Sequence, residues 1–184
     1  ISGEALTAFA DYCRSKNLIN SIHINEITID NEVSQEKFGM PLIPALEKLG
    51  VLDGHFLAVH CVQMTAEDIS ILGSHSIGVS HNPVSNMYLG SGVAPVIAME
   101  KAGVRMSLGV DGAASNNSQD MLETLKYTVL GQRVAQREPA CIQAEDALRM
   151  ATTGGAQDLQ SEDLLGRLEP GHKADVVALH FNSA

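Results

Sequence analysis

The chain has 184 residues, of which 45% are hydrophobic and 18% are charged, a composition that is ordinary for a globular protein with a substantial buried core. Its formal net charge of −10, from 12 basic and 22 acidic residues, argues against binding to nucleic acid or to an anionic membrane, because both need clustered basic side chains. We therefore expect a small molecule as the partner, and the sequence leaves a homo-oligomer open.

The three cysteines, Cys13, Cys61 and Cys141, lie in apolar segments and have no CxxC spacing. This pattern indicates buried, reduced thiols and hence a cytoplasmic protein. No apolar run reaches the roughly 18 residues of a membrane span, and no secretory leader is recognisable, so we expect neither membrane insertion nor export. A helical pattern that begins at Ile1, without an initiator methionine, indicates that the chain starts inside a larger protein.

Helices and short apolar strands alternate along the chain. The helices are marked by apolar residues at helical spacing, by the capping signal Thr65-Ala-Glu-Asp68 and by a first-turn proline, Pro95. The expected elements, in chain order, are helix 1–16, strand 19–22, helix 36–49 in one or two pieces, strand 56–59, helix 65–72, strand 76–80, loop 81–92, helix 95–102, strand 105–110, helix 121–137 and helix 144–151, which ends at 152–155.

This alternation predicts an α/β fold with a parallel sheet, in which right-handed crossovers place the carboxyl end of every strand on one edge. Each of four polar residues, His23, His60, His81 and Asp111, follows a predicted strand, so we expect these residues to converge. A (β/α)8 barrel is favoured over a doubly wound sheet, because no glycine-rich phosphate loop follows any of the strands.

The tail has a different pattern. Glu169-Pro-Gly171 predicts a turn, and the β-branched run from Asp175 to Leu179 predicts a strand with no helix behind it. We therefore divide the chain into a sheet-and-helix domain, 1–160, and part of a separate small β element, 161–184.

Strand-end residues of these types predict a metal site. His23 and Asp111 offer an imidazole and a carboxylate on rigid strand ends, where ligands can hold a fixed geometry. Glu26 lies three residues after His23, where it can move protons between metal-bound water and substrate, and His60 can act as a second proton carrier. Since zinc centres usually have three or more protein ligands, further ligands must come from elsewhere.

Structural interpretations compete with these roles. His23 could be a core histidine, His60 could fill the mouth of the barrel, and Asp111 could cap the Asp-Gly turn that it opens. The run His81-Asn-Pro83 fits a purely structural role in its loop equally well. We expect residues 115–117 to stabilise their loop rather than to bind substrate.

Five motifs, in matching order, resemble the amidohydrolase superfamily, and within it the branch of methylthioadenosine/S-adenosylhomocysteine deaminases and triazine chlorohydrolases. The motifs are His23-Ile-Asn-Glu26, His60-Cys-Val-Gln63, Ser80-His-Asn-Pro-Val-Ser-Asn86, Leu108-Gly-Val-Asp-Gly-Ala-Ala-Ser-Asn-Asn117 and Gly166-Arg-Leu-Glu-Pro-Gly-His-Lys-Ala-Asp-Val-Val177. Together they extend over nearly the whole chain, which makes the resemblance specific.

The resemblance implies a metal-dependent (β/α)8 barrel with a small flanking β-sandwich. Residues 1–160 would be its second half, strands 5 to 8, and residues 161–184 would start the returning β-sandwich segment. His23 and Asp111 would bind one divalent metal, Zn²⁺ or alternatively Fe²⁺. Asp111 would also accept a proton from the nucleophilic water, Glu26 would protonate the substrate's ring nitrogen, and His60 would orient the attacking hydroxide. Glu26 and Asp111 would thereby contact the substrate.

The implied reaction is hydrolytic deamination at an aromatic ring carbon of a small heteroaromatic substrate, most simply the adenine ring of S-adenosylhomocysteine or methylthioadenosine. A chlorohydrolase and a guanine-, pterin- or triazine-type substrate stay open, as do a non-catalytic barrel-derived module and a barrel completed by another polypeptide. The family's His-x-His pair does not occur in this sequence, so the fragment alone is expected to be inactive. Such a pair roughly 150 residues before Ile1 would favour the enzyme.

Overall fold

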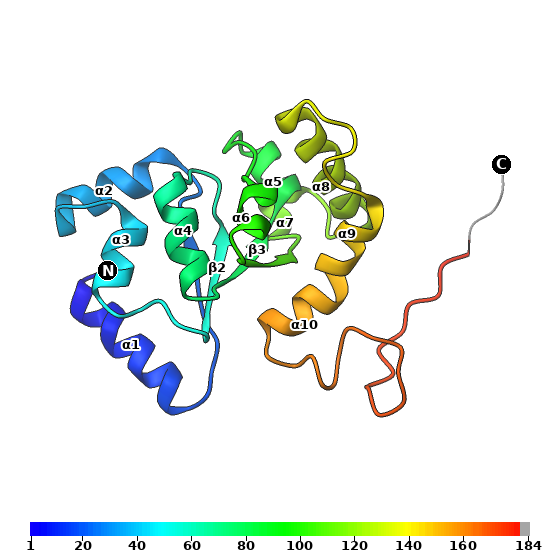
Figure 1. Ribbon diagram of the computed structural model, residues 1–184, viewed down its shortest axis with the longest axis horizontal. Coiled ribbons are helices and arrows are strands. Elements are labelled where there is room, and N and C mark those ends of the chain that lie inside the picture. The colour runs from blue at the N-terminus through cyan, green and yellow to red at the C-terminus, as the bar shows by residue number, and fades with distance from the viewer. Residues whose placement is uncertain (181–184) are drawn as a thin grey trace.

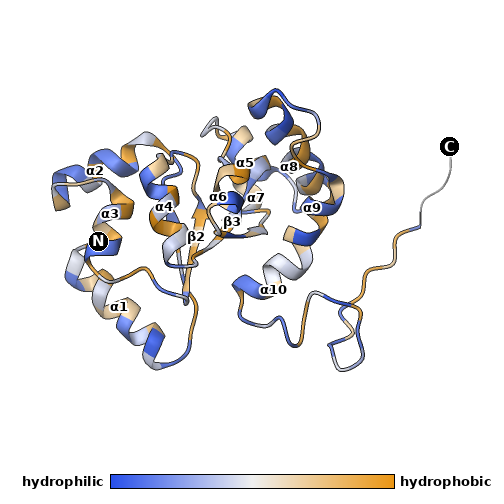
Figure 2. Ribbon diagram, viewed as in Figure 1, coloured by the Kyte–Doolittle hydropathy of each residue, from blue (hydrophilic) through white to orange (hydrophobic). Residues whose placement is uncertain are grey.

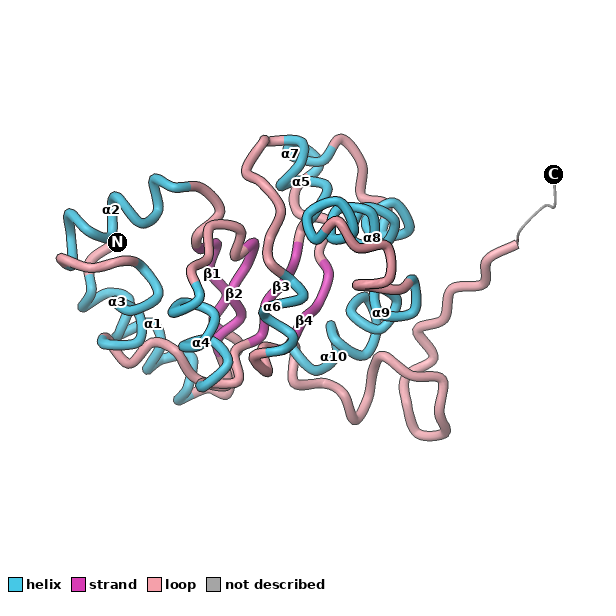
Figure 3. The backbone as a smooth tube through the Cα atoms, turned by 45° about the horizontal axis from the view of Figure 1, so that its top comes forward, coloured by secondary structure: helices cyan, strands magenta, loops and turns pink. Residues whose placement is uncertain are grey.

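A parallel sheet of four strands lies at the centre of the computed structural model, which describes residues 1–180 (Figure 1, Figure 3). In order across the sheet, the strands are β1 (Asn20–Ile24), β2 (Phe56–His60), β3 (Gly78–His81) and β4 (Arg105–Leu108). Neighbouring strands pair in parallel, with His23 opposite Val59 and His81 opposite Leu108. The four carboxyl ends therefore lie at one edge of the sheet, as the alternation of elements predicted.

Helices connect the strands and lie on either side of the sheet in the view of Figure 1. They are α1 (Gly3–Ser15), α2 (Thr28–Phe38), α3 (Leu42–Lys48), α4 (Ala66–Ser74), α5 (Pro83–Tyr88), α6 (Val96–Lys101), α7 (Ala113–Asn116), α8 (Met121–Gln136), α9 (Ala144–Arg149), the π-helical turn η1 (Met150–Gly154) and α10 (Gly155–Asp158). The predicted capping box is confirmed at the start of α4, where the Thr65 side chain accepts a hydrogen bond from the Asp68 N–H and the Asp68 side chain accepts one from the Thr65 N–H.

The core forms where the sheet meets its helices. Ala58 of β2 and Val79 of β3 are completely buried, as are Leu72 of α4 and Met99 of α6. In hydropathy colouring, β2 stands out as a hydrophobic strand between more polar helices (Figure 2). Burying a large apolar side chain contributes roughly 1.5–3 kcal/mol, so this interface fixes the sheet and, with it, the strand ends.

Three helical segments, α2, α5 and α7, were not predicted. Helix α2 begins at Thr28, well before the expected start at residue 36, and α5 occupies part of the segment predicted as a loop. Periodicity could not reveal α2, because its apolar residues Ile29 and Val33 are exposed. Its start is fixed instead by the Asp30 carboxylate, which accepts a hydrogen bond from the Glu26 N–H at 2.8 Å.

The last helical segment does not stop at the glycine pair Gly154-Gly155 as expected, but continues through η1 and α10. Gly154 packs against β4, and a Cβ atom at this position would collide with the carbonyl oxygen of Met106. The glycine therefore permits close contact between helix and strand, and is no signal for the end of a helix.

The tail matches its prediction only in part. The turn forms, with the His172 N–H donating to the Glu169 carbonyl at 3.1 Å. The strand expected over 175–179 is absent, and Val176 and Val177 are exposed. No strand within residues 1–180 pairs with this segment, and an unpaired strand lacks the hydrogen bonds that define one. The separate β element over 161–184 stays a prediction, and residues 181–184 lie outside the described part of the chain.

Candidate functional site

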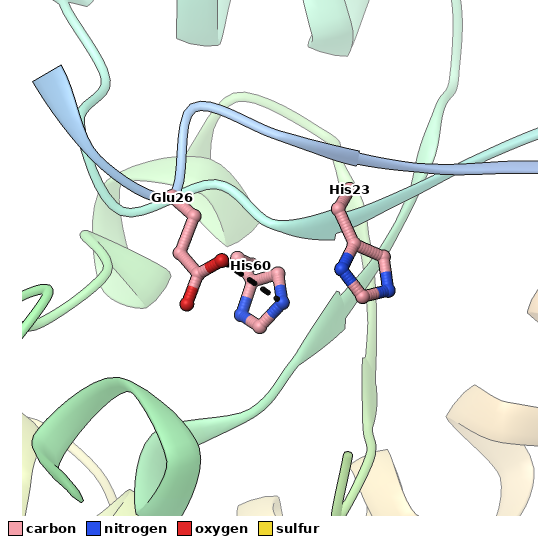
Figure 4. A group of neighbouring side chains, drawn as sticks. All are labelled: His23, Glu26 and His60. Carbon is pink, nitrogen blue, oxygen red and sulfur yellow. Dashed lines mark ion pairs between the residues drawn. The ribbon is translucent and has the colours of Figure 1, made fainter. Parts of the chain in front are cut away.

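The carboxyl edge of the sheet brings the predicted site residues together. His23 lies in β1 and Glu26 follows its end, while His60 is the last residue of β2 and Asp111 comes shortly after β4. The rings of His23 and His60 meet edge to face, with their centroids 4.8 Å apart (Figure 4). The expected convergence is therefore observed for His23 and His60.

His60 is the centre of this cluster. Its Nε2 atom lies 3.7 Å from Glu26 Oε2 and 3.9 Å from Asp111 Oδ2. One donor atom from each of His23, Glu26 and His60 lies within 4.8 Å of the others, a spacing at which three side chains can share one ion. Asp111, predicted to bind metal together with His23, is not one of these three residues. It lies beside the group, next to His60.

Left-handed backbone geometry, which is uncommon outside glycine, occurs at the ends of three strands. Asn25 has a φ of 48°, His60 a φ of 76° and Asp111 a φ of 61°. Conformations of this kind cost on the order of 1–3 kcal/mol each and persist where surrounding contacts hold them. For Asn25 these contacts are visible, because its carbonyl accepts hydrogen bonds from the backbone N–H groups of Val62 and Gln63 at 2.9 and 2.7 Å.

The imidazole of His60 is buried and tied at one nitrogen only. Its Nδ1 lies 2.8 Å from the Oδ1 atom of Asn86 in α5, whereas Nε2 is buried with no hydrogen-bond partner among the described residues. A buried polar atom without a partner costs roughly 1–3 kcal/mol, so such an atom usually has a ligand or a water beside it. Nε2 is the atom that faces Glu26 and Asp111, and the cluster therefore fits a bound ion or water.

The carboxylate of Asp111 accepts three hydrogen bonds. Ser85 Oγ and Ser115 Oγ donate to Oδ2 at 2.6 and 3.0 Å, and the Gly112 N–H donates to Oδ1 at 2.7 Å. Burial by itself raises the pKa of the Asp111 carboxyl, but these hydrogen bonds and the charge of His60 outweigh it and hold the pKa below its ordinary value. A carboxylate has about four lone-pair directions, so three donors leave one for a metal or a proton.

Glu26 is partly exposed, with 22% of its side chain accessible, and is oriented by the loop after α5. Ser91 Oγ donates to Glu26 Oε1 at 3.2 Å, which leaves Oε2 on the side of His60. This arrangement presents a carboxylate that can exchange protons with a molecule at the sheet edge.

His81 is also at this edge but has a different character. It is completely buried, and burial, followed by the charge of His60, lowers its pKa to about 3. It is therefore neutral at ordinary pH, and its neighbour Asn82 makes the local bond to backbone that a structural role predicts, from Nδ2 to the Ser80 carbonyl at 3.4 Å. The loop-stabilising role expected of residues 115–117 is seen at Asn116, whose side chain donates to the Val110 carbonyl.

Sequence reasoning missed the partners of the site residues. Each of three site residues has such a partner: Asp111 contacts Ser85, His60 contacts Asn86 and Glu26 contacts Ser91. The motif that contains Ser85 and Asn86 was recognised in the sequence, but no role was expected of these two residues. Pro83 was the available signal, because a proline in the first helical turn favours the helix on which Ser85 and Asn86 lie.

The cysteines are free thiols, as expected. Cys13 and Cys61 are buried, while Cys141 is only partly buried. Burial and, to a smaller extent, the charge of Asp68 raise the pKa of the Cys61 thiol, so this neighbour of His60 stays protonated. Among residues 1–180, no helix has the length and apolar character needed to cross a membrane.

Similar proteins place this arrangement in a wider context. A methylthioadenosine/S-adenosylhomocysteine deaminase from Desulforudis audaxviator is 45% identical over 161 residues, which are 88% of this chain and 37% of that protein. A 5'-deoxyadenosine deaminase from Methanothermobacter thermautotrophicus is 40% identical over 97% of this chain and 42% of its own length. The chain thus spans about two fifths of these relatives.

Solved structures share the fold. An adenosine deaminase from Xanthomonas campestris with bound zinc superposes with a TM-score of 0.91 at 28% identity, over 95% of this chain and 40% of that one. The zinc complex of the atrazine chlorohydrolase TrzN from Arthrobacter aurescens gives 0.88 at 30% identity, over 94% and 38%. The profile of the amidohydrolase family matches residues 1–183, and the chain therefore belongs to the amidohydrolase family.

Proposed function

We propose that this chain is part of a metal-dependent hydrolytic deaminase that acts on a heteroaromatic ring, with the adenine ring of S-adenosylhomocysteine or methylthioadenosine as the first candidate substrate. The observation that carries this proposal is the buried Nε2 of His60, which has no hydrogen-bond partner within residues 1–180 and faces the carboxylates of Glu26 and Asp111. The relatives named for deamination of such nucleosides support the choice of substrate.

His23 and Asp111 would hold one divalent ion; donor atoms of Glu26 and His60 lie within 4.8 Å of one of His23, and Asp111 Oδ2 lies 3.9 Å from His60 Nε2. Imidazole and carboxylate donors suit zinc, which is bound in two similar structures, and Fe²⁺ is the alternative. When bound, such an ion makes water acidic enough to supply a nucleophile near neutral pH. The remaining ligands would come from a part of the protein outside this sequence.

The side chains of this chain divide the proton transfers. Asp111, kept ionised by its three hydrogen bonds, accepts a proton from the attacking water and passes it to the amino group, which leaves as ammonia. Glu26, whose Oε2 is not engaged by Ser91, donates a proton to the ring nitrogen of the substrate. His60 orients the attacking water through Nε2. One carboxylate thus acts on the attacking water and the other on the substrate ring.

We also propose that β1 to β4 are strands 5 to 8 of a (β/α)8 barrel, and that residues 161–184 begin a returning β-sandwich segment. The consecutive parallel order of the strands and the similarity to longer enzymes support this arrangement. Strands β1 and β4 would then pair with strands from the rest of the protein, and residues 1–184 alone would not turn over substrate.

Dechlorination of a triazine is the second candidate, favoured by the similarity to TrzN. The same cluster could direct water to a ring carbon that carries chlorine instead of an amino group. Parallel assays of ammonia and chloride release from the intact protein decide between the two reactions.

The direct test of the proposal is Glu26→Gln in the intact protein. Glutamine keeps the size of the side chain but cannot transfer the proton, so we expect deamination to fall by at least the roughly 10²–10⁴-fold that acid–base catalysis supplies. Bound metal should remain. Glu32→Gln, the same change at an exposed position of α2, is the control and should retain activity. Undiminished turnover in Glu26→Gln would refute the assigned role.

A further inference from the structure

One short segment contacts three different residues of the site. Three buried side chains between residues 85 and 91, in α5 and the loop after it, reach partners at the carboxyl ends of β4, β2 and β1. The pairs are Ser85 Oγ with Asp111 Oδ2 at 2.6 Å, Asn86 Oδ1 with His60 Nδ1 at 2.8 Å, and Ser91 Oγ with Glu26 Oε1 at 3.2 Å. We call residues 83–91 the positioning segment.

The positioning segment is held at both ends. The Asn86 N–H donates to the Asn82 carbonyl at 3.0 Å, and the Ser91 N–H donates to the Asn86 carbonyl at 2.8 Å. The Ser91 carbonyl in turn accepts a hydrogen bond from Gln63 Nε2 at 2.8 Å. These bonds fix the backbone from which the three polar side chains project, so the segment can impose an orientation on its partners.

We propose that Asn86 is a positioning residue that fixes the tautomer of His60, with the hydrogen on Nδ1 and the lone pair of Nε2 facing Glu26 and Asp111. An amide oxygen has only lone pairs, so its 2.8 Å contact with Nδ1 is a hydrogen bond only if Nδ1 carries the hydrogen. In the opposite tautomer, two lone pairs would face each other in a fully buried place.

Rotating the amide of Asn86 by half a turn would reverse this assignment. Nδ2 would then donate to His60 Nδ1, and the hydrogen of the imidazole would move to Nε2. A lone pair on Nε2 suits the proposed function better, because a hydrogen there would point toward a cation held by His23 and Asp111. With the lone pair in place, His60 accepts a hydrogen bond from a water at the sheet edge and thereby orients it. The choice between the two amide orientations and the role of the tautomer in turnover both rest on the proposed function, whereas the tautomer can be measured without it.

The test is ¹⁵N NMR of the histidine rings in the intact protein, at a pH where the imidazole of His60 is neutral. Imidazole nitrogens with and without a hydrogen have well separated shifts, and His60→Gln identifies the relevant signals. We expect the hydrogen on Nδ1 in the wild type and in Asn86→Asp, whose carboxylate can also accept it. Asn86→Leu has a similar size and no acceptor, so it should lose this preference.

Two results would overturn the proposal: a wild-type His60 with its hydrogen on Nε2, or an Asn86→Leu protein that keeps it on Nδ1. The first does not depend on Asn86→Leu, so the proposal stays testable even if that variant does not fold.

Kinetics provide the second measurement. Partners that orient a site residue typically contribute 10- to 100-fold, so we expect Asn86→Leu to lower kcat by roughly that factor while KM changes far less. Asn86→Asp should recover most of the loss, because it restores the acceptor. Ser34→Ala is the control, since this buried hydroxyl donates to the Met40 carbonyl at 2.9 Å in another part of the molecule.

The two proposals can fail separately. If the NMR result is as expected and no nucleoside is deaminated, the proposed function is wrong and the positioning of His60 stands. If deamination is observed with the hydrogen on Nε2, the function stands and the positioning inference is wrong. Equal loss of kcat in Asn86→Asp and Asn86→Leu, with the tautomer kept in the former, would show that Asn86 affects turnover by another route.

Discussion

Arg105→Met should destabilise the protein in a strongly pH-dependent way, because it removes the partner of a buried carboxylate. At the amino end of the sheet, Arg105 Nε lies 3.2 Å from Asp158 Oδ1, and the Asp158 side chain is only 1% exposed. Burial raises the pKa of the Asp158 carboxyl, and the hydrogen bond and charge of Arg105 offset only part of this effect.

The magnitude follows from protonation. Loss of one partner of a buried ion pair costs about 3–5 kcal/mol, but Asp158 can escape by taking up a proton. For a carboxyl with an ordinary pKa of about 3.9, protonation costs about 1.4 kcal/mol per pH unit, hence about 4 kcal/mol at pH 7 and about 1.5 kcal/mol at pH 5. A raised pKa favours the folded state at low pH, and this stabilisation is lost as the pH rises. The cost of Arg105→Met should therefore fall by about 2–3 kcal/mol between pH 7 and pH 5.

Urea unfolding of the intact protein at the two pH values measures this difference. The control compares the double variant Arg105→Met/Asp158→Asn with Asp158→Asn: with no ionisable group at 158, the cost of removing Arg105 should be the same at pH 5 and pH 7. An equal cost of Arg105→Met at both values would refute the idea that Asp158 is left as an uncompensated buried charge.

Three further predictions concern packing, metal binding and acid stability. Gly154→Ala should lower the free energy of unfolding by about 1–3 kcal/mol, measured by thermal unfolding, because its Cβ would collide with the Met106 carbonyl. Gly155→Ala is the control: its Cβ would meet no atom nearer than 3.9 Å, so it should be neutral or stabilising. Equal effects of the two substitutions would contradict the packing argument. His23→Ala should weaken zinc binding by more than the 10- to 100-fold typical of outer-shell partners, as measured by metal analysis after graded chelation, and full zinc retention would exclude His23 as a ligand. Because the pKa of Asp111 is lowered in the folded state, its carboxylate stabilises the fold above a pH of about 4, and this stabilisation is lost as the pH falls through the folded-state pKa. The melting temperature of metal-free Asp111→Asn should therefore fall less in acid than that of the metal-free wild type. Identical pH profiles of the two proteins would contradict this prediction.

The sheet and the positions of the site residues were predictable because both depend on local patterns. Short apolar runs such as 56–59 mark buried strands, and a polar residue directly after such a run, such as His60, must lie at the strand end. Parallel pairing then brings His60 and Asp111 to the same edge without any knowledge of the packing. The chemistry of the cluster could therefore be proposed from the sequence.

The partners of these residues depend on tertiary packing, which the sequence pattern does not encode. Asn86 and His60 are 26 residues apart, and Ser91 and Glu26 are 65 residues apart. Helix α5 has a proline start but no apolar stripe, so periodicity identified its residues as a loop. Gly154 led to the opposite error, a helix end that is not there. A glycine that allows close contact with β4 cannot be distinguished in the sequence from a glycine that ends a helix.

The strained strand ends link the fold to the chemistry. Asn25, His60 and Asp111 each have a left-handed backbone that costs free energy, and each is held by hydrogen bonds from outside its own strand. Two of these sets of bonds come from the positioning segment, which is itself anchored by Gln63. Because these contacts are between protein groups, they orient His60 and Asp111 without help from an ion. Preorganisation of this kind reduces the reorganisation needed when charge develops during a reaction. Helix α5, which holds none of the proposed metal ligands, would affect turnover in this way.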